Sequence, residues 1–206
     1  MLTLYYSPRT RSSRIIRLID ELGIWNEVDI RIVSVTRSDG SGGPDPQNPH
    51  PEGKVPLLVH DGVEIWESNA IILYLTDMFP NAGMGPVPGD PQRGRYLSWL
   101  AWYGNVVEPV VVFGVAQLSH PVLDATFRGV PEMTARLAGA LEGAPFLMGE
   151  SFTAADLLVA SAFTWSPDAA PDNPAIKAWI GRCEARPSAR RMAEFDMKHL
   201  ERGGAT

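Results

Sequence analysis

One short segment places a proline where a β-strand should begin. Val55-Pro56-Leu57-Leu58 reads as the start of an apolar strand, yet proline cannot donate to a sheet and avoids strand interiors. A cis bond before Pro56 would turn the main chain of Val55 outward, so that its N–H and C=O could pair with an extended ligand. The alternative is an ordinary trans proline that opens an edge strand.

A second segment, Glu67-Ser68, lies eleven residues downstream of Pro56, where a strand gives way to a helix. The first N–H groups of a helix are unpaired and carry partial positive charge, which favours a carboxylate ligand. The Ser68 hydroxyl would add a donor, and Glu67 could hold an ammonium group. Ser68 could instead only cap its own helix. Together the two segments would suit a small peptide with an α-amino acid end.

The elements that position these segments mix two periodicities. Apolar residues alternate over residues 2–6 and 28–32, and they recur at helical spacing between Ile15 and Leu22, ahead of Gly23. This order predicts a right-handed βαβ unit with parallel strands. Residues 38–53 are rich in glycine and proline and predict a loop. Asp61-Gly62 between two apolar runs predicts a hairpin, and a helix is expected over residues 67–78.

The second half of the chain shows only helical periodicity. Glycine and proline crowd into residues 80–91, as is typical of a linker. Tyr96, Trp99 and Tyr103 form a helical stripe, and Thr153-Ala-Ala-Asp156 is a helix-start signature. Two further helices are expected over residues 175–184 and 189–197. The predicted organisation is an α/β domain over residues 1–79, a linker over 80–91 and an all-α domain over 92–206.

Composition narrows the class of protein. The 206 residues include 18 basic and 24 acidic side chains, and the net charge of −6 argues against binding to nucleic acid or to an anionic membrane. Cys183 is the only cysteine, and the four histidines show no metal-ligand spacing, so neither a disulfide nor a metal site is predicted. No signal peptide or membrane span is recognisable, and a cytoplasmic protein is expected.

Five segments, in order along the chain, resemble the glutathione transferase family. They are Tyr5-Tyr6-Ser7-Pro8, Asn48-Pro49 with Gly53-Lys54-Val55-Pro56-Leu57, Glu67-Ser68-Asn69-Ala70-Ile71, Gly149 to Asp156, and Ala178-Trp179 with Ala185-Arg186-Pro187. The resemblance implies a thioredoxin-like N-terminal domain, a helical C-terminal domain and a homodimer.

The resemblance also implies how glutathione, the co-substrate, would bind. Val55, with Pro56 cis, would pair its main chain with the cysteinyl unit. Glu67 and Ser68 would hold the γ-glutamyl amine and carboxylate. Lys54 would meet the glycyl carboxylate. Many relatives have a helix that contacts the glycyl end of glutathione where this chain has the glycine- and proline-rich segment 38–53.

The group that activates the glutathione thiol stays open. The family places a tyrosine, serine or cysteine between the first strand and the first helix, and the absence of a cysteine here excludes the mixed-disulfide chemistry of the cysteine classes. Arg11 stands where those classes carry their cysteine, with Ser12 beside it. A guanidinium charge or a hydroxyl hydrogen bond could stabilise the thiolate, and Thr10, Tyr6 and Ser7 are further candidates. Ser12 could equally be a helix cap, and Arg11 a solvated surface residue.

An acceptor pocket for a small, apolar electrophile is expected between the domains. Its candidate lining residues are Tyr96, Trp99, Tyr103 and Val107, although an aromatic stripe at this spacing also suits a core or dimer contact. Pro109 should kink the helix that carries them. The predicted function is glutathione S-transferase. The alternatives are a non-catalytic binding or regulatory protein with this fold, and a glutathione-dependent isomerase or dehalogenase.

Overall fold

The computed structural model describes residues 1–203 of the chain, and side chains up to residue 200. Two compact units form: Met1–Ala82 together with the segment that begins at Pro187, and Gly83–Arg186. The last helix therefore groups with the sheet, whereas the sequence assigned residues 92–206 to one helical domain. The last three residues of that predicted domain lie outside the described part.

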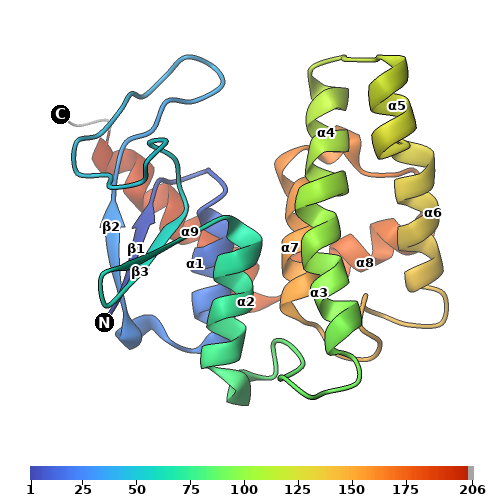
Figure 1. The fold of residues 1–206 in the computed structure, drawn as a ribbon, viewed down its shortest axis with the longest axis horizontal. Coiled ribbons are helices and arrows are strands. Elements are labelled where there is room, and N and C mark those ends of the chain that lie inside the picture. The colour runs from blue at the N-terminus through green and yellow to red at the C-terminus, as the bar shows by residue number, and fades with distance from the viewer. Residues whose placement is uncertain (204–206) are drawn as a thin grey trace. The chain divides into compact units, whose positions relative to one another are not determined.

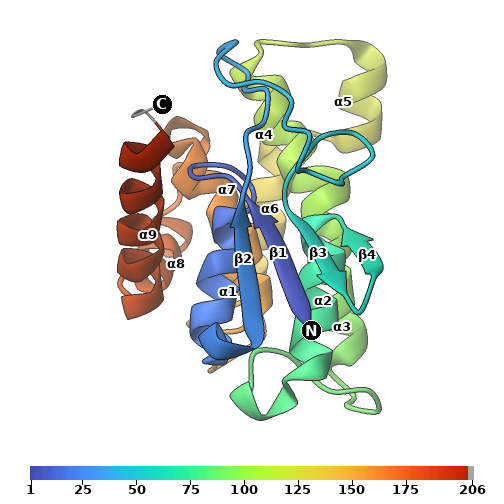
Figure 2. The same cartoon turned by 90° about the vertical axis from the view of Figure 1, so that its left-hand side faces the viewer.

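The first unit is built on a four-stranded sheet in the order β2-β1-β3-β4 (Figure 2). Strands β1 (Leu2–Tyr6) and β2 (Val28–Ile32) pair in parallel, as the βαβ pattern predicted. Strand β3 (Leu57–His60) runs antiparallel to β1 and to β4 (Val63–Trp66). Asp61 and Gly62 both have positive φ, +48° and +86°, which is the backbone of a tight hairpin turn and confirms that prediction.

Helices α1 (Ser13–Leu22) and α2 (Ser68–Met78) lie on one side of this sheet (Figures 1 and 2). Alternate residues of β1, Leu2, Leu4 and Tyr6, are buried. Gly23, with φ +71°, ends α1 as predicted, because a left-handed residue stops the helix and is cheapest for glycine. Between β2 and β3 the chain forms no helix or strand, which confirms the predicted loop.

Helix α9 (Pro187–Gly203) packs against α1. Arg191 of α9 donates to Asp20 of α1 at 2.8 Å from Nε to Oδ1 and 2.6 Å from Nη2 to Oδ2. Trp25 Nε1 donates to the same carboxylate at 2.9 Å. Burial acts to raise the pKa of Asp20, but the hydrogen bonds from Arg191 and Trp25 outweigh it and hold the pKa below its usual value.

This ion pair predicts a pH-dependent link between α9 and α1. Because the folded pKa of Asp20 is depressed, the link is fully present above the unfolded pKa of about 3.9 and is lost as the pH falls through the lower, folded value. A double-mutant cycle of Asp20→Asn and Arg191→Gln should give a coupling free energy of about 1 kcal/mol at pH 7, shrinking below pH ~4. Urea unfolding of the wild type, the two single variants and the double variant gives this coupling free energy.

The control for that cycle lies on the same helix. Arg190 and Glu194 are both exposed and 3.6 Å apart, so their cycle should give a coupling near zero at every pH. An Asp20–Arg191 coupling that is equally small at pH 7, or that grows on acidification, would contradict the assignment.

The second unit is helical. Its helices are α3 (Arg93–Trp102), α4 (Glu108–Val115), α5 (Pro121–Phe127), α6 (Val130–Ala140), α7 (Ala154–Trp165) and α8 (Pro174–Glu184). Figure 1 shows α3 and α4 as one continuous column beside α5 and α6. Helix α7 is the centre of the core, since nearly all of its side chains are buried.

Helix α7 begins with the predicted capping box. Asp156 is fully buried and accepts hydrogen bonds from Thr153 N and Oγ1 at 2.9 and 3.0 Å. It also accepts from Leu147 N at 2.8 Å and from Trp179 Nε1 of α8 at 2.9 Å. One carboxylate therefore joins the preceding loop, the start of α7 and the middle of α8.

The helix changes its type just before Pro109, where the sequence predicted a kink. Residues Tyr103–Val107 form a π-helical segment, and the N–H of Glu108 bonds to the carbonyl of Tyr103, five residues back. In a regular α-helix the ring of Pro109 would clash with the carbonyl of Asn105. The wider turn relieves that clash while α3 passes into α4.

The predicted linker is also more ordered than its composition suggested. Pro80–Ala82 form a single 3₁₀ turn, and Met84 is buried, with its carbonyl accepting from Ala154 N at 2.8 Å. Gly85 allows Tyr96 to pack closely, since a Cβ there would lie 2.8 Å from Tyr96 Cζ. The segment is therefore fixed to the helical unit by the start of α7.

Candidate functional site

The bond between Val55 and Pro56 is cis, which is the first of the two arrangements considered from the sequence. Pro56 is buried immediately before β3, while Val55 is partly exposed. Within the described residues, neither the N–H nor the C=O of Val55 has a hydrogen-bond partner. The pair is thus available to an extended main chain from outside.

Glu67 and Ser68 form the start of α2. Glu67 is exposed and has φ +71°, a left-handed value that costs a non-glycine residue energy and is often found at functional sites. Ser68 is the first helical residue and is buried, and across residues 1–203 its Oγ has no hydrogen-bond partner. Ser68 therefore does not cap its own helix through its side chain. A polar group without a partner stands at the positive end of a helix.

The turn between β1 and α1 is closed by its own hydroxyl groups. Ser12 Oγ donates to the carbonyl of Ser7 at 2.9 Å and accepts from the N–H of Ser7 at 3.0 Å. Thr10 Oγ1 donates to the same carbonyl at 2.7 Å and lies 2.7 Å from Ser12 Oγ. Ser12 is fully buried and does not cap α1, whereas Thr10 is partly exposed and Arg11 is exposed.

Tyr6 lies fully buried at the end of β1 and donates its phenol proton to Asp196 of α9. Burial, and then the hydrogen bond to this carboxylate, raise the pKa of Tyr6 far above its usual value. The structure therefore directs the Tyr6 hydroxyl into the protein, toward a partner 190 residues away. Nothing in the sequence pattern pointed to Asp196.

The loop after β2 supplies two cations near these segments. Arg37 Nη2 donates to the carbonyl of Pro8 at 2.9 Å and reaches Ser7 Oγ at 3.4 Å. Lys54 is exposed and ion-paired with Glu52. Arg37 was not singled out from the sequence, because a lone arginine at the edge of a glycine-rich loop carries no signal.

The candidate acceptor residues are buried within the helical unit. Tyr96 and Val107 are completely buried, and Trp99 and Tyr103 nearly so. Trp99 packs edge-to-face on Trp102 at 5.2 Å between ring centroids, and within the described residues its indole N–H has no hydrogen-bond partner. This placement favours the core role that the sequence had left open for the stripe.

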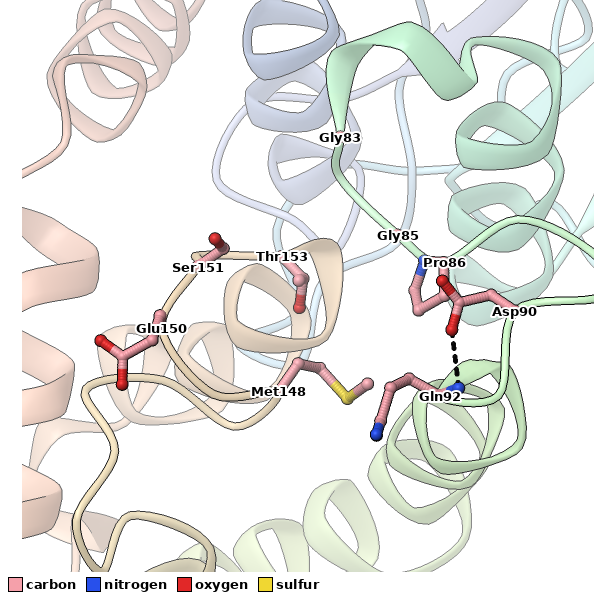
Figure 3. A pocket seen from close by; sticks show the side chains of 9 residues that line it. All are labelled: Gly83, Gly85, Pro86, Asp90, Gln92, Met148, Glu150, Ser151 and Thr153. Atoms are coloured by element: carbon pink, nitrogen blue, oxygen red, sulfur yellow. Dashed lines mark hydrogen bonds between the residues drawn. The ribbon is translucent and has the colours of Figure 1, made fainter.

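Two cavities lie among the described residues of the helical unit, and none of the predicted site residues lines them. One, of about 290 Å³, lies between the segment around Gly85 and the start of α7 (Figure 3). Asp90 and Glu150 stand on opposite sides of it, and Asp90 accepts from Gln92 N at 2.7 Å. The other, of about 160 Å³, is apolar and lies between α4 and α5.

Among the described side chains, which end at residue 200, no three histidine, cysteine or acidic groups gather in a way that would ligate a metal ion. Across residues 1–203, every helix is too short or too polar to cross a lipid bilayer.

Comparisons with known proteins agree with this architecture. Residues 2–77 match the family model of the glutathione S-transferase N-terminal domain, and residues 105–187 match that of the C-terminal domain. The disulfide-bond oxidoreductase YfcG of Escherichia coli is 27% identical, over 91% of this chain and 92% of YfcG.

Two solved structures have the same fold. A glutathione transferase from Methylococcus capsulatus has a TM-score of 0.77 and 26% identity, covering 96% of this chain and 100% of its own. A sphingomonad glutathione S-transferase complexed with glutathione has a TM-score of 0.75 and 27% identity, covering 94% and 98%. With a thioredoxin-like unit, a helical unit and both domain models matched in order, the chain belongs to the glutathione S-transferase family.

Proposed function

We propose that the chain is a glutathione S-transferase that binds glutathione, ionises its thiol and directs the thiolate to a small, apolar electrophile. Family membership supports glutathione as the co-substrate, and supports a cytoplasmic homodimer as the working form. The observation that carries the proposal is the unpaired main chain of Val55, found in the same unit as the unpaired Ser68 hydroxyl at the start of α2.

In this proposal each unpaired group has a partner on the peptide. The N–H and C=O of Val55 pair with the cysteinyl unit, as one strand pairs with another. Ser68 and the N–H groups of α2 hold the γ-glutamyl carboxylate, and Glu67 holds the ammonium. Lys54 would meet the glycyl carboxylate. Because its ion pair with Glu52 must break first, we expect Lys54 to contribute least to the affinity for glutathione.

Thiol activation requires a modest energy. A free thiol has a pKa of about 8.5, and lowering it by two units needs about 2.7 kcal/mol of preferential stabilisation of the thiolate. The start of a helix supplies roughly 0.3–2 kcal/mol, and a hydrogen bond to a charged acceptor about 1.5–3 kcal/mol. One hydroxyl at the start of α1 is therefore sufficient.

Among the candidate hydroxyl donors, accessibility favours Thr10. The hydroxyls of Tyr6 and Ser12 are fully buried and bonded within the protein, and Ser7 is also buried. Thr10 is partly exposed, and its hydroxyl can rotate from the Ser7 carbonyl to a thiolate. The exposed Arg11 guanidinium would add a screened positive charge.

A non-catalytic glutathione-binding protein is the second candidate, because the hydroxyls of Tyr6, Ser12 and Thr10 all donate to groups of the protein itself. A disulfide-exchange reaction like that named for YfcG would have to use the thiols of its substrates, since the one cysteine of this chain, Cys183, is fully buried in α8. The electrophilic reaction remains our proposal.

Calorimetric titration tests whether the protein binds glutathione and has an apolar acceptor site beside it. Glutathione and S-hexylglutathione should both bind to the wild-type protein, and the hexyl derivative should bind at least about tenfold more tightly, because each buried CH₂ contributes about 0.8 kcal/mol. Glu67→Gln should weaken both ligands. Glu64→Gln, an equal charge change at an exposed position of β4, serves as the matched control and should weaken neither.

The two functions give different results. Equal affinity for the two ligands, with no conjugation of a generic aryl halide, would favour the binding protein. No heat with either ligand, together with an unshifted melting temperature, would overturn glutathione binding altogether.

A further inference from the structure

We infer that Asp196 of helix α9 is a positioning residue for the thiol-activating turn, so that the last helix takes part in glutathione chemistry without touching glutathione. The inference makes two claims. The structural claim is that Asp196 holds the turn between β1 and α1 in shape. The catalytic claim, that this shape lowers the thiol pKa of glutathione, rests on the proposed function.

The carboxylate of Asp196 contacts both ends of that turn and its middle. Oδ1 accepts from the Tyr6 hydroxyl at the end of β1 and from Ser13 Oγ, the first residue of α1, at 2.9 Å. Oδ2 accepts from Ser13 Oγ at 2.8 Å and from the main-chain N–H of Arg9 at 3.0 Å. Residues 7–12, which carry every candidate donor except Tyr6, lie between these contacts.

Arg9 shows that the turn needs such a contact. Its φ of +54° lies in the left-handed region, which a non-glycine residue adopts at an energetic cost and keeps only when its surroundings impose it. The bond from Arg9 N to Asp196 Oδ2 is made in that conformation. The next residue is Thr10, whose direction is set by the backbone of Arg9.

The chemistry of the contact also argues for a role beyond packing. Asp196 is buried, and its hydrogen-bond donors here are two hydroxyls and one N–H, all of them neutral. A buried carboxylate is costly unless its oxygens are fully bonded. An apolar side chain would fill the same space at lower cost, but it could not hold three separate parts of the turn in register.

On its inner side the same turn is held by Ser12 and Thr10 through Ser7, and Arg37 holds the carbonyl of Pro8. Hydrogen bonds within the turn, from Arg37 of the loop after β2 and from α9 thus converge on residues 7–12. From α9, Asp196 holds the main chain of Arg9, and Met197 Sδ accepts from the Arg9 guanidinium at 3.5 Å. Removing Asp196 should free Arg9 and redirect Thr10 while leaving the Val55 and Ser68 contacts intact.

The test uses hydrogen exchange on the ligand-free protein and thiol titration on the glutathione complex. In Asp196→Asn, and more strongly in Asp196→Ala, the amides of residues 9–13 should exchange about tenfold faster or more, while those of β3 are unchanged. The thiol pKa of bound glutathione, followed by the ultraviolet absorbance of the thiolate, should rise by about one unit, a tenfold loss in the acidity constant. The Kd for glutathione should stay within about threefold.

Two further variants separate the loss of the Asp196 contacts from the loss of a negative charge and from the loss of the thiol donor. Glu194→Gln makes the same charge change at an exposed position of α9 and should alter neither measurement. Thr10→Val should raise the thiol pKa and speed exchange of the Ser12 amide, which donates to Thr10 Oγ1 at 3.2 Å, but it should leave the Arg9 amide as protected as in the wild type, because the Asp196 contacts stay in place.

Each remaining outcome overturns the inference in a recognisable way. Unchanged exchange in residues 9–13 would show that Asp196 does not hold the turn. Faster exchange with an unchanged thiol pKa would make it a purely structural residue, and a lower thiol pKa would show that its charge opposes the thiolate. If wild-type protein binds no glutathione, the proposed function is wrong, and the claim that Asp196 affects the thiol pKa is wrong with it. The hydrogen-exchange result on the ligand-free protein would still test whether Asp196 holds the turn.

Discussion

Asp156→Ala is expected to lower the free energy of unfolding of the helical unit by about 3–5 kcal/mol. Asp156 is fully buried, and its two oxygens accept from Leu147, Thr153 and Trp179 at 2.8–3.0 Å. Alanine would leave these donors buried without an acceptor, and it would remove the capping box of α7. Urea unfolding followed by tryptophan fluorescence measures the loss.

Asp168→Ala is the matched control, since Asp168 is an exposed aspartate in the turn just after α7. It should change the unfolding free energy by less than about 0.5 kcal/mol. The isosteric Asp156→Asn should fall between the two, because its one oxygen can still accept. A loss near 1 kcal/mol for Asp156→Ala would mean that the capping bonds are replaced by water, and that the carboxylate does not hold α7 to α8.

Ser68→Ala is expected to weaken glutathione binding by about 10–150-fold while leaving protein stability unchanged. The hydroxyl has no partner within the described residues, so its removal breaks no bond of the free protein. In the complex it would donate to the γ-glutamyl carboxylate, a charge-assisted bond of about 1.5–3 kcal/mol. Calorimetric titration gives the affinity and urea unfolding the stability.

The combination of the two measurements is diagnostic. If Ser68 were a helix cap, alanine would cost about 1 kcal/mol of stability and would leave the Kd unchanged. Ser98→Ala, at an exposed position of α3 in the other unit, controls for the loss of a hydroxyl as such. Unchanged affinity in Ser68→Ala would remove this residue from the proposed site.

The parts of the fold that were predicted correctly are those that local chemistry determines. Gly23 ended α1, Asp61-Gly62 made the hairpin, and Thr153 with Asp156 made the capping box, because each depends on residues within a few positions of one another. The cis bond at Pro56 was one of the two arrangements that the residues left open, and the family resemblance, not local chemistry, favoured it.

The parts that were missed depend on contacts between distant residues. Asp196 lies in an amphipathic helix, and its neighbours in sequence give no sign that its carboxylate bonds to Tyr6 and Ser13. The grouping of α9 with the sheet follows from this contact and from the Asp20–Arg191 pair, which no periodicity encodes. The π-helical turn before Pro109 was predicted only as a kink, because the clash can be relieved in more than one way.

The grouping of α9 with the sheet has a consequence for synthesis on the ribosome. The helical unit, Gly83–Arg186, is continuous in sequence and can fold as soon as it has emerged. The sheet unit closes only when Asp196 reaches Tyr6, 190 residues after it was made. The nascent chain can therefore complete its second-made unit first, and the turn that we assign to glutathione chemistry takes its final form only after α9 has emerged.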